Sequence, residues 1–183
     1  MKYFLIFFSF FFFIQSSANS DTARQIIDNL EKAKNYSFKF VQKINENEEK
    51  GNCVLVFDRK INCKYENNGK ILISDGKSLI IKSRISNIPN FYKLKDTYFY
   101  KILEKEYIIN ELSKTTVKKE YGKLYVDIND QNIDIKIYFD KEKLYLSGWE
   151  TKDIYNNSVL TEIKIQEVNG NVSENIFDLQ RFN

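Results

Sequence analysis

The 183-residue sequence contains no histidine, only one proline and only six glycines. Catalytic triads and general bases built on histidine are therefore excluded, as are histidine-ligated metal sites. So little proline and glycine argues against a disordered linker protein. A net charge of +3, from 28 basic and 25 acidic residues, is too even to predict nucleic-acid binding. The length fits one domain with one substantial core.

No enzyme motif stands out in what remains. The charged residues at helical spacing between positions 101 and 111 are interpreted as solvated ion pairs, rather than as an acid–base site: Lys101, Glu104, Lys105, Glu106 and Glu111. The aspartates near position 130 lack the glycine and closing glutamate of a calcium loop. Gly76 and Gly122 are typical of turns and not of a phosphate-binding loop. We expect a protein that is not an enzyme and that needs no cofactor and no metal.

The first eighteen residues have the pattern of a secretory signal peptide. Lys2 supplies the positive charge, and residues 3–14 are apolar except for Ser9. Small residues end at Ala18, where cleavage is expected. A membrane span needs about 20 apolar residues, which favours a signal peptide over the alternative of an uncleaved anchor. We therefore expect residues 1–18 to be removed and residues 19–183 to form a single exported domain.

Export affects how Cys53 and Cys63 are interpreted. Two cysteines ten positions apart in an oxidising compartment favour a disulfide, and the alternative is a pair of buried thiols. A hairpin that pairs Phe57 with Ile61 would place the two cysteines diagonally. In that register a disulfide needs a bulge or a local shift.

The apolar pattern predicts one helix followed by strands. Thr22 and Gln25 can form a capping box, and the apolar residues after them recur at helical spacing up to Ala33. From Tyr36 onward the period is two, which predicts about ten strands in a large antiparallel sheet that curls or closes. Residues 84–114 interrupt this pattern. Within them, residues 97–112 read as an inserted helix, capped by Asp96, across the face or mouth of the sheet.

One face of the predicted sheet is strongly apolar, and it has two interpretations. Its residues are Phe38, Phe40, Leu55, Phe57, Ile61 and Tyr65. They form either a core filled by the two helices or a cavity for an apolar ligand that the helices cover. The residues alone leave both interpretations open.

An ordered set of segments resembles the periplasmic outer-membrane lipoprotein carrier family (LolA). The segments are Ser37-Phe38-Lys39-Phe40-Val41-Gln42, Gly51 at the start of the next strand, Ile61-Asn62-Cys63-Lys64-Tyr65, and Ile73-Ser74-Asp75-Gly76-Lys77-Ser78-Leu79. A weaker similarity covers Trp149 to Val168 and Ile176-Phe177. These segments together span nearly the whole mature chain, and the signal peptide also agrees with the family.

The resemblance implies a mainly β (α+β) fold: an incomplete, curled antiparallel β-barrel of about 10–11 strands with an N-terminal helix and an inserted helical lid. It implies a monomeric periplasmic carrier in a Gram-negative bacterium, which takes lipoprotein acyl chains from an inner-membrane ABC transporter to an outer-membrane acceptor. The alternative on this fold is a periplasmic module that senses lipids or lipoproteins without transport. The expected lipid-binding residues are Phe38, Phe40, Leu55, Phe57, Ile61, Cys63, Tyr65, Phe99, Ile102 and Leu103.

The sequence departs from the family pattern around the second hairpin. The family's proline corresponds to Asp58, and its lid-latching arginine corresponds to Phe57. Arg59 is two positions further on, in the predicted turn. The family's inward aromatic pair falls at Ile61 and Cys63. A different attachment of the lid is therefore expected.

Overall fold

The computed structural model describes residues 15–57, 59–67, 69–83, 88–120, 122–130, 133–153 and 155–180. Residues 1–14 of the predicted signal peptide lie outside this part of the chain, as does Asp58.

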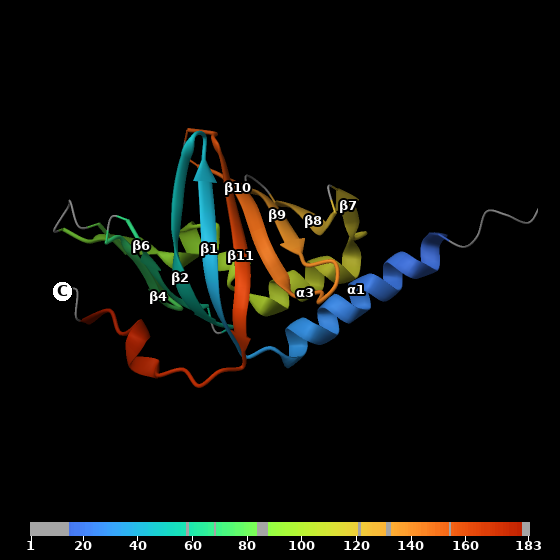
Figure 1. Cartoon of the computed structure of the whole chain (residues 1–183), viewed down its shortest axis with the longest axis horizontal. Helices are drawn as coiled ribbons and strands as arrows, with labels where there is room; N and C mark the ends of the chain where they lie inside the picture. The colour runs from blue at the N-terminus through green and yellow to red at the C-terminus, as the bar shows by residue number, and fades with distance from the viewer. Residues whose placement is uncertain are drawn as a thin grey trace, which may run out of the picture.

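Eleven strands form one antiparallel sheet with the spatial order β6-β5-β4-β3-β2-β1-β11-β10-β9-β8-β7 (Figure 1). Their bounds are β1 (Asn35–Ile44), β2 (Asn47–Val56), β3 (Lys60–Tyr65), β4 (Ile71–Asp75), β5 (Ser78–Lys82), β6 (Asn90–Lys93), β7 (Lys118–Glu120), β8 (Lys123–Asp130), β9 (Ile133–Phe139), β10 (Leu146–Lys152) and β11 (Ser158–Val168). The outermost strands, β6 and β7, do not pair with each other. The predicted fold class, an incomplete curled barrel, is confirmed.

Two of the strands were not expected from the sequence. β6 falls within, and β7 just after, the segment predicted to interrupt the sheet, and every residue of both is exposed. Strands of three or four residues with no buried face show no apolar alternation, so the pattern could not reveal them.

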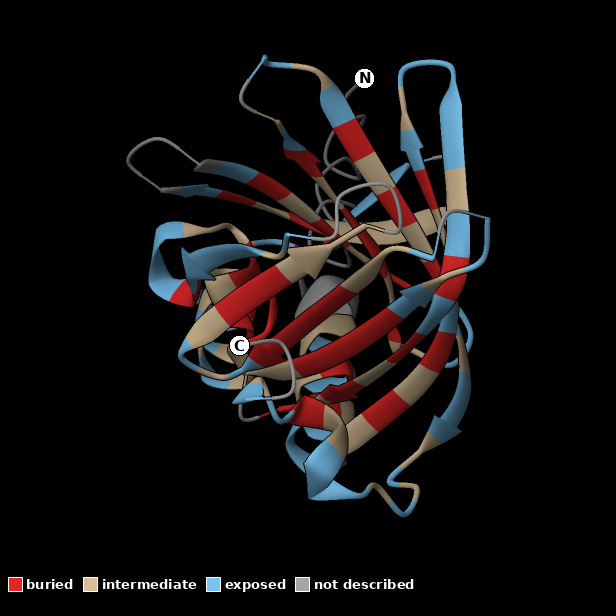
Figure 2. Cartoon of the chain, turned by 90° about the vertical axis from the view of Figure 1, so that its left-hand side faces the viewer, coloured by how far each residue is buried: buried red, intermediate tan, exposed pale blue. Residues whose placement is uncertain are grey.

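Buried residues alternate with more exposed ones along β1 and along parts of β2 and β11. Figure 2 shows this banding along the strands. In β1 the buried positions are Tyr36, Phe38, Phe40 and Gln42, whereas Lys39 and Lys43 are exposed. The pleat directs successive side chains to opposite faces, so this alternation places the apolar set on one side. The main core therefore lies between the curled sheet and the helices.

The N-terminal helix α1 (Gln15–Lys32) is longer than predicted. It begins seven residues before Thr22, so the expected capping box at Thr22 is wrong. The buried side of α1 consists of Ile26, Leu30 and Ala33 at its end, as the helical spacing predicts. This side packs on α3 (Lys105–Lys114), and the two helices lie side by side in Figure 1.

The inserted helix is divided, which corrects the prediction of one helix over 97–112. The chain forms η1 (Leu94–Asp96), α2 (Phe99–Ile102) and α3, with extended backbone at Glu104. The Asp96 cap is also absent, because Tyr98 is the residue before α2. At 100° per residue, a continuous helix would direct Ile108 about 180° away from Phe99. The break turns both residues toward the core, where both are buried.

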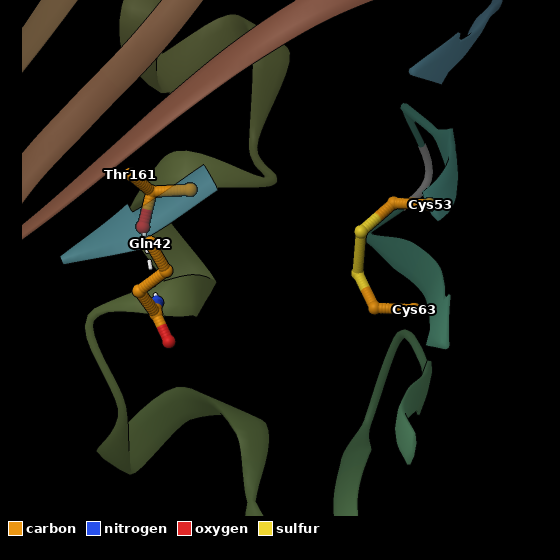
Figure 3. Close-up of a disulfide and its surroundings, with 4 residues drawn as sticks. All are labelled: Gln42, Cys53, Cys63 and Thr161. Atoms are coloured by element: carbon orange, nitrogen blue, oxygen red, sulfur yellow. Dashed lines mark hydrogen bonds between the residues drawn. A yellow bond between two sulfur atoms is a disulfide. The ribbon is translucent and has the colours of Figure 1, made fainter. Parts of the chain in front are cut away.

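Cys53 and Cys63 form a disulfide between β2 and β3 (Figure 3). The predicted register of this hairpin is wrong by two residues. Leu55 lies opposite Ile61, and the two cysteines are directly opposite each other with their Cα atoms 4.1 Å apart. The turn lies one position earlier than predicted, because Phe57 leaves β2 and Lys60 already pairs with Val56, and this moves the register by two residues. Arg59, in the turn, adopts a φ of 64°. No bulge is needed for the bond.

We expect the disulfide to contribute about 3 kcal/mol to the free energy of unfolding, because it closes a short loop in the unfolded chain. A Cys53→Ala/Cys63→Ala double variant should lose about that amount in urea denaturation. Reductant should destabilise the parent protein similarly and leave the double variant unchanged. Equal midpoints for the parent with and without reductant would contradict this assignment.

Candidate functional site

The structure brings all ten predicted lipid-binding residues into one apolar cluster. Seven of them lie on β1, β2, β3 and the turn after β2, and three lie on α2 and the residue after it. Nine are buried, and Tyr65 is half-buried. Their grouping follows from strand parity on the sheet side and from the (i, i+3) spacing of Phe99 and Ile102 on the helix side.

The interior that these residues surround is packed. The cavity among them measures about 10 Å³ and is lined by Phe38, Phe40, Gln42, Cys53, Ile61, Cys63, Tyr65, Leu72, Phe99, Trp149 and Thr161. A volume of this size holds about one water molecule and no acyl chain. The structure is therefore a closed state, in which the protein's own side chains fill the space that the cavity interpretation leaves open.

Gly51 is required for the packing of this interior. It lies between Phe40 and Tyr65 across β1, β2 and β3, and the two rings meet edge-on with centroids 4.9 Å apart. A Cβ atom at position 51 would lie 2.7 Å from the Phe40 ring and 2.2 Å from the carbonyl oxygen of Lys64. Glycine therefore allows Phe40 to lie over the backbone of β2.

Three polar residues of the interior were not predicted as site residues: Gln42, Trp149 and Thr161. Gln42 on β1 lies opposite Thr161 on β11, and Thr161 lies opposite Trp149 on β10. The side-chain amide of Gln42 donates from Nε2 to Thr161 Oγ1 at 3.0 Å (Figure 3). Gln42 has the same strand parity as Phe38 and Phe40, and this parity was the signal that could have identified it.

The Nε1–H group of Trp149 has no hydrogen-bond acceptor among the described residues, although the side chain is buried. A buried donor without a partner costs about 1–3 kcal/mol. In the closed state the apolar interior therefore leaves this donor unsatisfied by the described residues, as it does the hydroxyl of Tyr36.

The tyrosines that face the interior are neutral at physiological pH. Burial raises the pKa of Tyr98 to about 12, and burial also raises the pKa of Tyr65 above its ordinary value. These phenols therefore add no charge to the apolar interior.

The segment from η1 to α3 (residues 94–114, called the lid below) is attached to the β2–β3 turn by Arg59. The Arg59 guanidinium forms an ion pair with Glu104 and donates to the Tyr100 hydroxyl at 3.1 Å. It also lies 5.1 Å from the centre of the Tyr100 ring. Glu104, which the sequence places among the solvated ion pairs of the helix, thus pairs with an arginine outside the helix. Arg59 reaches the lid because it lies in the turn, before β3 begins, and not on a strand face.

A second attachment joins the lid to α1. Lys105 Nζ donates to the carbonyl oxygen of Ala33 at 3.2 Å and to that of Glu31 at 3.4 Å. A cation at the C-terminal end of a helix is stabilised by the unpaired carbonyl groups there. The lid is thus held on either side of the break at Glu104.

A larger groove of about 380 Å³ involves the convex side of the sheet. It is lined by Ser37, Phe38, Asn52, Cys53, Val54, Asn62, Lys64, Gln166 and Ile176. The C-terminal segment with η2 (Glu174–Phe177) borders the groove, where Asn62 Nδ2 donates to the carbonyl oxygen of Ile176. Most of the predicted site residues lie away from this groove.

Within the described ranges, no three or more Cys, Asp or Glu side chains gather in a way that could hold a metal ion. The helices in the same part of the chain are too short or too polar to cross a bilayer.

No family model matches the sequence, and no curated protein matches it. Among solved structures, it is similar to a LolA superfamily protein from Nitrosomonas europaea, with 5% identity, 89% of this chain and 98% of that chain covered, and a TM-score of 0.48. An uncharacterised conserved protein from Thermus thermophilus has 13% identity, 85% and 92% coverage and a TM-score of 0.49. The lipoprotein LppX from Mycobacterium tuberculosis has 10% identity, 87% and 99% coverage and a TM-score of 0.46.

We expect Glu104→Gln to open the lid more often, because it removes the charge that holds Arg59. The pair is partly exposed, so the loss should be about 1 kcal/mol, which corresponds to a roughly five-fold higher opening constant. Hydrogen exchange of the α2 and α3 amides measures this constant. Glu174→Gln is the matched control, since Glu174 pairs with Lys60 away from the lid. Equal exchange in both variants would show that the ion pair does not hold the lid.

Proposed function

We propose that this protein is a periplasmic carrier that binds the acyl chains of lipoproteins between its curled sheet and its lid. It would receive them from an inner-membrane ABC transporter and deliver them to an acceptor at the outer membrane. The N-terminal signal pattern supports export, and no catalytic residue is required for this function.

The observation that carries the proposal is the position of the lid. The chain leaves the sheet at one free edge, β6, and rejoins it at the other, β7, so the lid connects the two edges of the open sheet. Its buried residues Phe99, Ile102, Leu103, Ile108 and Leu112 belong to the same cluster as the concave face. The lid therefore occupies the surface that an acyl chain would need.

Such an arrangement makes loading an exchange between two occupants of one surface. Each acyl CH₂ gains about 0.8 kcal/mol on leaving water, so three long chains represent roughly 30 kcal/mol or more. Lipoproteins therefore need a carrier to cross an aqueous compartment. Exposing each buried lid side chain costs about 1.5–3 kcal/mol, which offsets part of that gain and limits how tightly the cargo is held.

The attachments of the lid suit such an exchange. Arg59 and Lys105 hold it through side-chain contacts, and neither contact requires a strand of the sheet to separate from its neighbour. The lid can leave the concave face while the paired strands stay intact.

We expect Phe57→Glu to reduce the amount of lipoprotein that co-purifies with the protein at least ten-fold. The change places a carboxylate on the apolar face, and Lys105 Nζ, 5.7 Å from the centre of the Phe57 ring, can partly compensate its charge in the closed state. Native mass spectrometry of protein from the periplasm measures the bound cargo. Ile61 is less suitable for this substitution, because it is fully buried and a carboxylate there would be removed from water.

Phe91→Glu is the matched control. It makes the same substitution at an exposed position on β6, outside the interior cluster. We expect this variant to carry cargo like the parent. If a folded Phe57→Glu protein carried as much lipoprotein as Phe91→Glu, the concave face would not be the binding site.

Depletion of the protein tests transport separately from binding. Loss of a carrier should leave lipoproteins at the inner membrane, which fractionation of the two membranes would show. If lipoproteins still reached the outer membrane at the normal rate, a carrier role would be wrong and a sensing role would remain.

A further inference from the structure

The apolar interior contains a row of polar side chains on three neighbouring strands. Gln42 on β1 lies opposite Thr161 on β11, and Thr161 lies opposite Trp149 on β10. All three line the residual cavity, next to Phe99 of the lid. A purely hydrocarbon ligand would give these groups nothing to bind.

Trp149 is the unsatisfied member of this row. Its side chain is 4% exposed, and its Nε1–H group has no acceptor among the described residues. The indole nitrogen can only donate, so its partner must be an acceptor. Gln42, whose amide already donates one hydrogen bond to Thr161, has a second N–H for the same purpose.

The residues that line the cavity determine whether a charged or a neutral acceptor can bind there. None of the residues lining the cavity is charged. A carboxylate or phosphate placed there would be buried without a cation, which is strongly unfavourable. A neutral carbonyl oxygen needs only one or two hydrogen-bond donors, and an indole N–H and an amide N–H are donors of that kind.

We infer that the row formed by Gln42, Thr161 and Trp149 binds the ester carbonyl of an acyl chain once Phe99 has moved aside. The inference rests on the proposed function, and it specifies the ligand: an acyl ester, held at its carbonyl, rather than any hydrocarbon chain. Since Trp149 has no acceptor among the described residues in the closed state, its hydrogen bond to the ligand favours the loaded state over the closed one.

A pair of lipids that differ only in the carbonyl groups tests the inference. 1,2-Dioctanoylglycerol has two ester carbonyls, and the diether 1,2-dioctylglycerol has none. We expect the full exported protein to bind the diester at least ten-fold more tightly. Trp149 is the only tryptophan, so its indole N–H gives a single nitrogen–proton correlation, which should move downfield with the diester and not with the diether.

A substitution that keeps the shape of the ring isolates the N–H group. Replacing Trp149 by benzothienylalanine exchanges the N–H for a sulfur atom, and Trp149→Phe gives a second variant without the donor. Both should bind the diester and the diether within about two-fold of each other. Because the parent alone already distinguishes the two lipids, the result does not depend on either variant folding.

Two other results of the lipid comparison are possible, and they differ in which proposal they overturn. Equal affinities of the parent for both lipids, with the indole signal unmoved, would overturn the carbonyl site and leave the carrier proposal standing. Failure of the parent to bind either lipid would overturn both proposals.

Discussion

The packing of the lid against the concave face of the sheet determines the state of the whole molecule. Phe99, Ile102 and Leu103 are buried on the same apolar surface as Phe38 and Phe40. This contact covers the interior of a sheet whose edges, β6 and β7, do not meet. Without the lid, that surface would be exposed to water, and an exposed apolar patch of this kind favours binding of another apolar body. The closed interior and the proposed ligand exchange are therefore two consequences of one contact.

The attachments around this contact are polar and local. Arg59 reaches the lid because the β2–β3 turn releases it from the strand at a positive φ. Lys105 reaches α1 because that helix ends beside α3 with free carbonyl groups. The disulfide between Cys53 and Cys63 stiffens β2 and β3, which supply much of the concave face. The sheet is thus covalently reinforced, whereas the lid depends on side-chain contacts.

The sequence predicted the sheet side of the site and much less of the lid. Alternation at Tyr36, Phe38 and Phe40 needs only the pleat of a strand, so burial of these residues followed directly. The hairpin register depended on the position of one turn, and placing that turn one residue too late moved the cysteines two positions out of alignment. No glycine or proline marks the break at Glu104. The break allows Ile108 to pack in the core, and this is a tertiary requirement that the local sequence does not show. The pairing of Gln42 with Thr161 joins the first and last strands of the sheet in chain order, and local periodicity contains no information about it.

The central claim is that the lid and an acyl chain compete for one surface. Hydrogen exchange of the protein with and without bound lipoprotein tests it most directly. The account predicts that loading lowers the protection of the α2 and α3 amides and leaves that of β1, β2 and β3 unchanged or higher. A loaded protein whose lid remained as protected as in the empty state would show that the cargo binds elsewhere.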